Sequence, residues 1–168
     1  MIEIKIADAQ LAQAAEQGID EFLAAIIRAT KQAIGGELTA ANMQQLSTSQ
    51  ITLLAFDILH EEVMDGGFIQ LIHNGYGGFI FLNPVAKVLK DWGLKDLSKL
   101  LFAGKKLYFD NRKALEKDCS DEEFMALYEQ HPDFDDLDDE FVANEEQWTS
   151  DLAMYVDEHL SDFVSVTA

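Results

Sequence analysis

The densest cluster of side chains that could do chemistry is a run of carboxylates in the last third of the sequence. The run consists of Asp133, Asp135, Asp136, Asp138, Asp139, Glu140, Glu145 and Glu146. Carboxylates three or four residues apart on a helix lie about 5–6 Å from one another, so a helix could present them in rows. Duplex DNA also presents a regular path of negative charge, and an Arg fork binds carboxylates and phosphates alike. We therefore predict that these eight residues contact a basic protein.

The charge is distributed very unevenly along the chain, whose net charge is −19. All 12 Lys and Arg lie between Lys5 and Lys117, whereas residues 118–168 hold 17 of the 31 acidic residues and no Lys or Arg. We call residues 118–168 the acidic third. Phosphates would be repelled by this segment, which argues against direct binding of a nucleic acid. An acidic tail that only keeps the protein in solution is the alternative.

Apolar residues at helical spacing argue that the acidic third is folded and is not a solvated tail. They are Trp148, Leu152, Tyr155, Val156, Leu160 and Phe163. Asp151, Glu158 and Asp162 lie on another face of the same predicted helix. A folded acidic third would hold its carboxylates in fixed positions.

Other chemistry has weaker support in the sequence. A calcium loop that starts at Asp133 or Asp136 has no glycine at its sixth position, so neither frame fits an EF-hand. The spacing of His60 and His73 matches no helical zinc motif, and Cys119 has no evident base nearby. We expect no metal, no cofactor and no catalytic activity.

The elements that must position the carboxylates are predicted to be helices. Apolar spacing and breaker residues indicate helices over about 20–34, 39–46, 49–65, 68–74, 84–92, 94–115, 120–130 and 148–163. The alternation in residues 2–6 indicates one short extended segment at the N-terminus. We expect an all-α, compact, single-domain fold of residues 1–168.

Several residues predict where these helices begin, end or break. Asp20 is a plausible N-cap, Asn83 caps a helix with Pro84 at its first position, and Ser120 with Glu123 forms a capping box. Gly66-Gly67 interrupts one helix, and Gly104 lowers helix propensity enough for a break.

The most distinctive segment runs from Glu62 to Gly77 and resembles the signature of a bacterial family. The best-understood type of that family is an acidic DNA-mimic protein. The signature reads Glu-Val-Asn-Asn-Gly-Gly-Phe-x-Gln, followed by an Asn and a closing Gly. The matching residues are Glu62, Gly66, Gly67, Phe68, Gln70, Asn74 and Gly77. Met64 and Asp65 stand where two Asn residues are usual, and the resemblance covers about residues 50–168.

The resemblance implies an all-helical fold, a homodimer, and an acidic surface that occupies the DNA-binding face of a helix-turn-helix regulator. We read Gly66-Gly67 as a reversal between two packed helices, plugged by Phe68. In this reading Gln70 and Asn74 satisfy the backbone groups that the break exposes. Two alternatives stay open: an immunity protein for a basic nuclease toxin, and a small-molecule pocket or enzyme site at Glu62, Gln70 and Asn74.

The sequence also carries an expectation about location. Its apolar runs are too short to cross a bilayer, and its first residues do not read as a signal peptide. The single cysteine, Cys119, suits a reducing compartment. We expect a cytoplasmic protein with no membrane contact.

Overall fold

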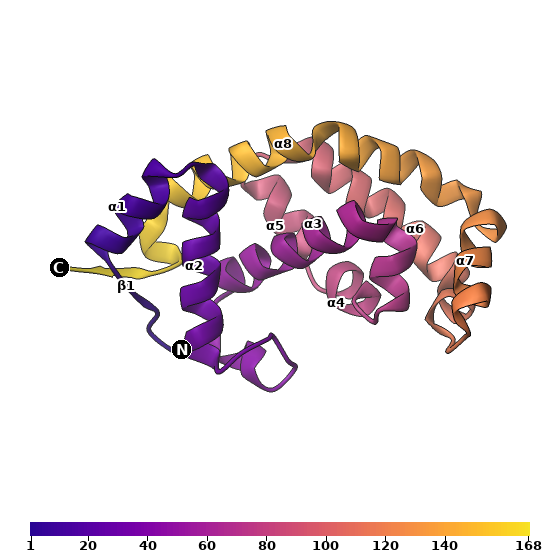
Figure 1. Cartoon of the computed structure of the whole chain (residues 1–168), viewed down its shortest axis with the longest axis horizontal. Coiled ribbons are helices and arrows are strands. Elements are labelled where there is room, and N and C mark those ends of the chain that lie inside the picture. Colours follow the sequence, from indigo (N-terminus) through magenta and orange to yellow (C-terminus); the bar gives the residue numbers. More distant parts are fainter. The chain divides into compact units, whose positions relative to one another are not determined.

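A computed structural model describes all 168 residues, Met1–Ala168, and is mostly helical, which confirms the predicted fold class (Figure 1). The helices are α1 (Asp8–Glu16), α2 (Ile19–Ile34), α3 (Thr48–His73), α4 (Gly77–Leu82), α5 (Val85–Asp91), α6 (Lys95–Glu116), α7 (Asp121–Gln130) and α8 (Asp135–Glu158), with 3₁₀ turns η1 (Asn42–Gln45), η2 (Pro132–Phe134) and η3 (Leu160–Asp162). Two short strands complete the fold, β1 (Lys5–Ala7) and β2 (Ser165–Thr167). None of the helices is both long and apolar enough to cross a membrane.

The chain forms two compact units. Unit 1 contains residues 1–54 and 147–168, and unit 2 contains residues 55–146. The expectation that residues 1–168 form a single domain stays a prediction.

Unit 1 joins the two ends of the chain. β1 pairs in parallel with β2, with Ile6 opposite Val166, which confirms an extended N-terminal segment. The side-chain amide of Gln50 donates to the carbonyl of Phe163 at 2.9 Å and ties α3 to the same region. Neither α1 nor β2 was predicted. α1 buries only Leu11 and Ala14, too few residues to show a period, and a three-residue strand gains its stability from its partner.

Unit 2 contains an aromatic core. Phe68, Tyr108, Phe134 and Phe141 are fully buried, and the rings of Phe68 and Phe141 meet edge to face with centroids 6.4 Å apart. α6 is continuous through Gly104, so the break considered there does not occur. The ring of Phe81 lies where a side chain at 104 would stand, 3.1 Å from an ideal Cβ, so the glycine allows close packing.

Local sequence signals located some helix ends correctly. Ser120 and Glu123 form the predicted capping box at the start of α7, with both bonds at 3.2 Å. Gly35 ends α2 in the left-handed conformation, φ 89°. The helix predicted over about 120–130 also ends where expected, since α7 ends at Gln130.

Other helix ends differ from the prediction. α2 begins after Gly18, and Asp20 lies in its first turn, where its charge still favours the helix dipole. Pro84 is the N-cap of α5, whereas the side-chain amide of Asn83 donates backward to the carbonyl of Phe79 and closes α4.

Segment lengths also differ. Only Asn42–Gln45 is helical within residues 39–46, and only as a 3₁₀ turn. α8 starts at Asp135, well before the predicted start at residue 148, and ends at Glu158, before the predicted end at residue 163.

Candidate protein-binding face and the joint beneath it

α3 is broken at the Gly66-Gly67 pair, as the sequence predicted. Gly66 has φ −150° and ψ 16°, and Gly67 has φ 75° and ψ −177°, so neither residue is helical. The conformation of Gly67 is one that only glycine adopts without strain. We call this break, together with the start of the helical segment that follows at Phe68, the joint. A break of this kind exposes backbone donors and acceptors that need partners.

Two side chains from the acidic third supply those partners. The backbone N–H of Phe68 donates to Oδ1 of Asp138 at 2.8 Å, and the hydroxyl of Tyr128 donates to the carbonyl of Gly66 at 2.7 Å. An added Cβ at Gly67 would overlap the Asp138 carboxylate, so the glycine also leaves room for it. Asp138 therefore acts as an N-cap supplied by another helix.

The prediction that Gln70 and Asn74 satisfy the backbone at the joint is wrong. Their amide groups instead donate to Oε2 of Glu62, at 2.8 Å and 3.1 Å, and Gln70 also donates to Asp65 at 2.9 Å. These bonds link the segment before the joint to the segment after it. Gln70 and Asn74 thus bond to side chains, whereas Asp138 and Tyr128 form the hydrogen bonds to the backbone groups of the joint.

The remaining motif residues pack around the joint. Phe68 is fully buried, as expected for a plug. Gly77 faces the ring of Tyr108, whose Cε1 atom lies 2.5 Å from an ideal Cβ on the glycine. Gly77 does not close the helix before it. Gly75, at φ 94°, follows that helix, and Gly77 begins α4. The motif thus includes residues of small volume where helices approach closely.

Asp138 has unusual electrostatics for a carboxylate in an acidic protein. Its pKa is raised to about 6: burial is the main cause, the hydrogen bond from Phe68 opposes the shift, and the charges of Asp135 and Asp139 add to it. Burial also raises the pKa of Tyr128, as do the charges of Asp138 and Asp65. Both groups therefore favour their neutral forms more than exposed groups do.

The eight predicted contact residues divide into two sets. Six are exposed: Asp133, Asp135, Asp136, Asp139, Glu140 and Glu146. Two are turned toward the interior of unit 2, namely Asp138 at the joint and Glu145, whose side chain is only 17% exposed. Oε2 of Glu145 lies 2.7 Å from Nε2 of His60 on α3. We call the six exposed residues the acidic face.

The sequence contains a signal for the two inward residues that counting charges overlooks. Asp138 and Glu145 fall at helical spacing with Phe134 and Phe141, both fully buried. Positions 134, 138, 141 and 145 form one stripe along a helix. A carboxylate within an apolar stripe is expected to have a polar partner inside the protein. Nothing in the local sequence identifies Phe68 or His60 as that partner.

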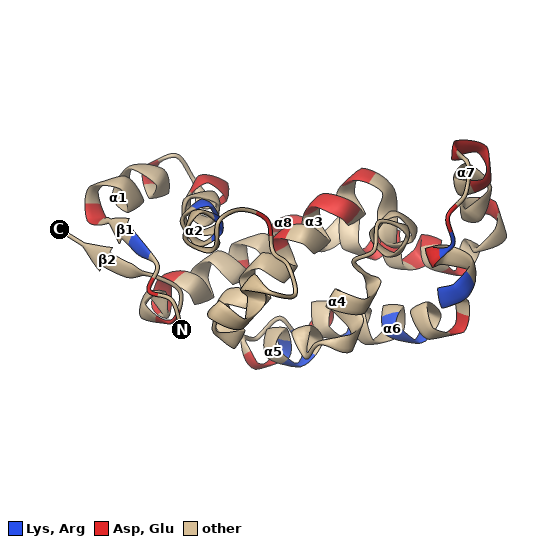
Figure 2. Ribbon diagram, turned by 90° about the horizontal axis from the view of Figure 1, so that it is seen from below, with Lys and Arg blue, Asp and Glu red and all other residues tan.

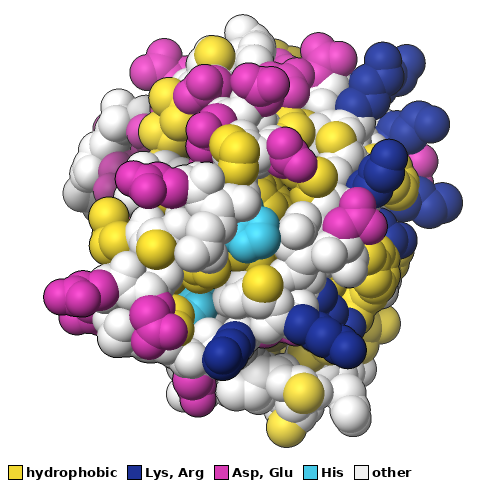
Figure 3. Space-filling view, turned by 90° about the vertical axis from the view of Figure 1, so that its right-hand side faces the viewer, with side chains coloured by type: hydrophobic (Ala, Val, Ile, Leu, Met, Phe, Trp, Pro, Cys, Tyr) yellow, Lys and Arg dark blue, Asp and Glu magenta, His cyan; other side chains and the backbone are white.

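The charges of unit 2 are segregated on its surface. Lys and Arg lie along α5 and α6, whereas Asp and Glu dominate α7 (Figure 2). The space-filling view shows acidic side chains gathered on one side and basic side chains on another, with apolar surface among the basic ones (Figure 3). A basic partner would therefore meet one distinct side of this unit.

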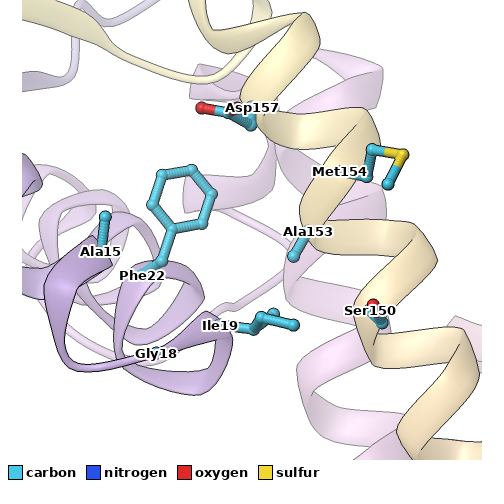
Figure 4. Close-up of a pocket in the computed structure, with 8 residues that line it drawn as sticks. All are labelled: Ala15, Gly18, Ile19, Phe22, Ser150, Ala153, Met154 and Asp157. Atoms are coloured by element: carbon cyan, nitrogen blue, oxygen red, sulfur yellow. The ribbon is translucent and has the colours of Figure 1, made fainter.

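Unit 1 contains an apolar groove that the sequence did not indicate. Its volume is about 330 Å³, and Phe22 and Ala153 face it from α2 and α8 (Figure 4). The full lining consists of Ala15, Gly18, Ile19, Phe22, Ser150, Ala153, Met154 and Asp157. The groove contains none of the eight predicted contact residues.

A family model described as DMP19-like protein matches residues 44–159. The chain belongs to this family. One relative, named DNA mimic protein DMP19, comes from Neisseria meningitidis serogroup B. It is 35% identical over 122 residues, which cover 72% of this chain and 74% of that protein. The predicted resemblance is thereby confirmed, and the DMP19-like region includes both the joint and the acidic face.

Proposed function

We propose that this DMP19-like protein is an acidic DNA mimic that binds the DNA-binding face of a basic transcription regulator and blocks its binding to DNA. The observation that carries the proposal is the row of exposed carboxylates on the first half of α8, anchored from beneath by Asp138. The homodimer implied by the resemblance is part of the same proposal.

The charge density of α8 supports the mimicry. Five residues between 135 and 146 are exposed carboxylates: Asp135, Asp136, Asp139, Glu140 and Glu146. Twelve helical residues span about 18 Å, so these carboxylates supply about one charge per 3.6 Å of helix. One strand of DNA supplies one charge per about 3.4 Å of its axis. A surface that binds one phosphate strand would thus meet a similar linear density of charge.

The carboxylates are also held in place before any partner arrives. Phe134 and Phe141 are fully buried in unit 2 and fix the rotation of α8 about its own axis. The contacts of Asp138 with Phe68 and of Glu145 with His60 fix it further. Preorganisation of this kind reduces the entropy lost on binding.

The proposal also specifies the partner's chemistry. An Arg-rich surface shaped for phosphates forms bidentate bonds with carboxylates as well. Binding is expected to be fast at low ionic strength and to weaken as salt screens the charges. The relative from Neisseria meningitidis is named a DNA mimic protein.

The test is capture from host lysate with the wild-type chain and with the fourfold variant D135N/D136N/D139N/E140Q. We expect wild type to retain a DNA-binding protein that duplex DNA then releases. We expect the fourfold variant to lose at least about tenfold in affinity for that protein once it is purified, since several charge pairs are removed together.

A matched control separates the acidic face from net charge alone. The variant E16Q/D20N/E158Q/D162N removes the same four charges from exposed positions in unit 1 and should bind like wild type. Equal loss in both variants would mean that only the net charge matters, which contradicts the proposal. Capture of a nuclease in place of a DNA-binding regulator would favour the immunity-protein alternative.

A further inference from the structure

The apolar groove of unit 1 plays no part in the proposed function. Phe22 and Ala153 are the buried part of its lining, whereas Ile19 is 45% exposed and Met154 is 61% exposed beside them. Exposed apolar side chains that gather around a concave apolar surface are typical of a binding site. The groove volume of about 330 Å³ lies within the range of small-molecule sites, about 300–1,000 Å³. The groove is therefore large enough for a small ligand.

Two polar side chains also line the groove, namely Ser150 and Asp157 of α8. They are seven residues apart, which separates them by about 10 Å along the helix axis. Figure 4 shows the Asp157 side chain extending from α8 toward the side of the groove where Phe22 lies. Neither polar side chain forms a hydrogen bond or an ion pair within the chain. Both are therefore available to a ligand.

The surroundings of Asp157 are acidic. Unit 1 contains ten Asp or Glu and three Lys or Arg, a balance of −7. The three basic residues are Lys5, Arg28 and Lys31, and each forms an ion pair with a glutamate. None of them pairs with Asp157, so the counter-charge of this carboxylate is left to a ligand or to solvent.

We propose that the groove binds a small organic cation, whose ammonium group is attached to an aromatic or branched aliphatic body. The body lies against Phe22, Ile19 and Met154, and the ammonium group pairs with Asp157. The hydroxyl of Ser150 bonds to a polar group at the other end of the molecule. A methionine side chain is flexible and adapts to different shapes, so the body can vary. The site needs no regulator, and the proposal does not depend on DNA mimicry.

Three other occupants fit the groove less well. An apolar anion such as a fatty acid would be repelled by Asp157 and by the charge of −7 on unit 1. A neutral apolar molecule would gain the apolar contacts but no attraction from the carboxylate. A stable contact with another protein involves about 20–30 residues on each side, whereas eight residues line this groove.

The test is binding of three naphthalene probes to purified full-length protein at low salt, followed by the amide chemical shifts of the protein. The probes are 1-naphthylmethylamine, a cation, the neutral 1-naphthalenemethanol, and the anion 1-naphthoate. The amine should bind with a Kd below about 1 mM, and the shift changes should centre on the groove. The alcohol should bind about threefold more weakly and the naphthoate at least about tenfold more weakly, because an exposed charge pair contributes up to about fivefold in affinity.

A charge variant tests the role of Asp157. D157N should weaken binding of the amine about three- to fivefold and leave binding of the alcohol unchanged. D151N is the matched control, because Asp151 is also exposed on α8 but does not line the groove. D151N should bind the amine within about 1.5-fold of wild type. Equal weakening in the two variants would mean that only the net charge attracts the amine, which overturns the proposed pairing.

An apolar variant tests the walls of the groove. I19A/M154A should weaken binding of the amine and of the alcohol alike, at least about fivefold, because apolar contact is lost. M125A/V142A shortens two exposed apolar side chains in unit 2 and should bind both probes like wild type. Unchanged amide shifts away from the altered positions check that each variant is folded.

Three results would overturn the proposal: no binding of the amine by wild type, equal binding of the amine and the naphthoate, or full binding by I19A/M154A. If wild type binds no amine and I19A/M154A retains less of the regulator in the lysate capture, the occupant is an apolar segment of that protein. The probe titrations themselves involve no regulator, so they can fail while the proposed function holds, and the reverse.

Discussion

The joint and the acidic face contain the same kind of side chain in two different environments. Asp138 lies beneath the face and accepts a hydrogen bond from the backbone of Phe68, whereas its neighbour Asp139 is exposed. The pKa of Asp138 is raised to about 6 chiefly by burial. One helix thus uses a carboxylate on its inner side to hold its outer carboxylates in position. Adjacent acidic residues in a dense run therefore have separable roles.

The largest effect is expected at Gly67, because its backbone conformation forms the break in α3 and its missing side chain leaves room for the Asp138 carboxylate. The variant G67A should lower the free energy of unfolding by about 3 kcal/mol or more, because a strained backbone adds to the loss of the Asp138 bond. G35A is the control, since Gly35 is also left-handed but has open space around it, and should cost about 1–2 kcal/mol. Urea unfolding of both variants measures the difference. Equal losses of stability in G67A and G35A would mean that displacing the Asp138 carboxylate from the joint costs nothing.

The comparison of Asp138 with Asp139 gives the next largest effect. D138A leaves the Phe68 N–H without an acceptor and should cost about 1–3 kcal/mol of stability. D139A, at an exposed position, should change stability by no more than about 0.5 kcal/mol. Partner affinity should respond to D139A even though stability does not. A stable D138A protein would show that another group caps the joint.

A smaller effect is expected at Tyr128. Y128F removes the hydroxyl that donates to Gly66 and should cost about 1 kcal/mol, measured by thermal or urea unfolding. Y76F, at a tyrosine with no hydrogen bond to the joint, is the matched control and should be nearly neutral. Equal effects in the two variants would mean that the hydroxyl of Tyr128 does not stabilise the joint.

The smallest effect concerns pH. The pKa of Asp138 is raised in the folded state, so its protonation stabilises the fold at low pH, and this contribution disappears as pH rises through about 6. The stability of wild type relative to D138N should therefore increase as pH falls from about 6 to 4. Unfolding curves of wild type and D138N at several pH values measure this difference. A constant difference would place Asp138 in an exposed environment.

Much of the fold could be predicted from local signals. The capping box at Ser120, the break at Gly66-Gly67 and the buried Phe68 all depend on residues near one another in the chain, and each is confirmed. α1 and β2 could not be predicted, because short elements gain their stability from contacts with distant residues. The same limit explains η1, where the chain forms only one 3₁₀ turn.

The site was predictable in composition but not in detail. The sequence by itself determined the charge polarity, the helical nature of the acidic third and the family motif, because composition and helical period are properties of the chain alone. Helical spacing with Phe134 and Phe141 is a sequence signal that Asp138 and Glu145 face inward, but only the tertiary structure decided which groups they meet and which groups meet at the joint. The partners of Asp138 and Tyr128 are 70 and 62 residues away in the sequence. No local pattern specifies such pairs, since packing between helices selects them.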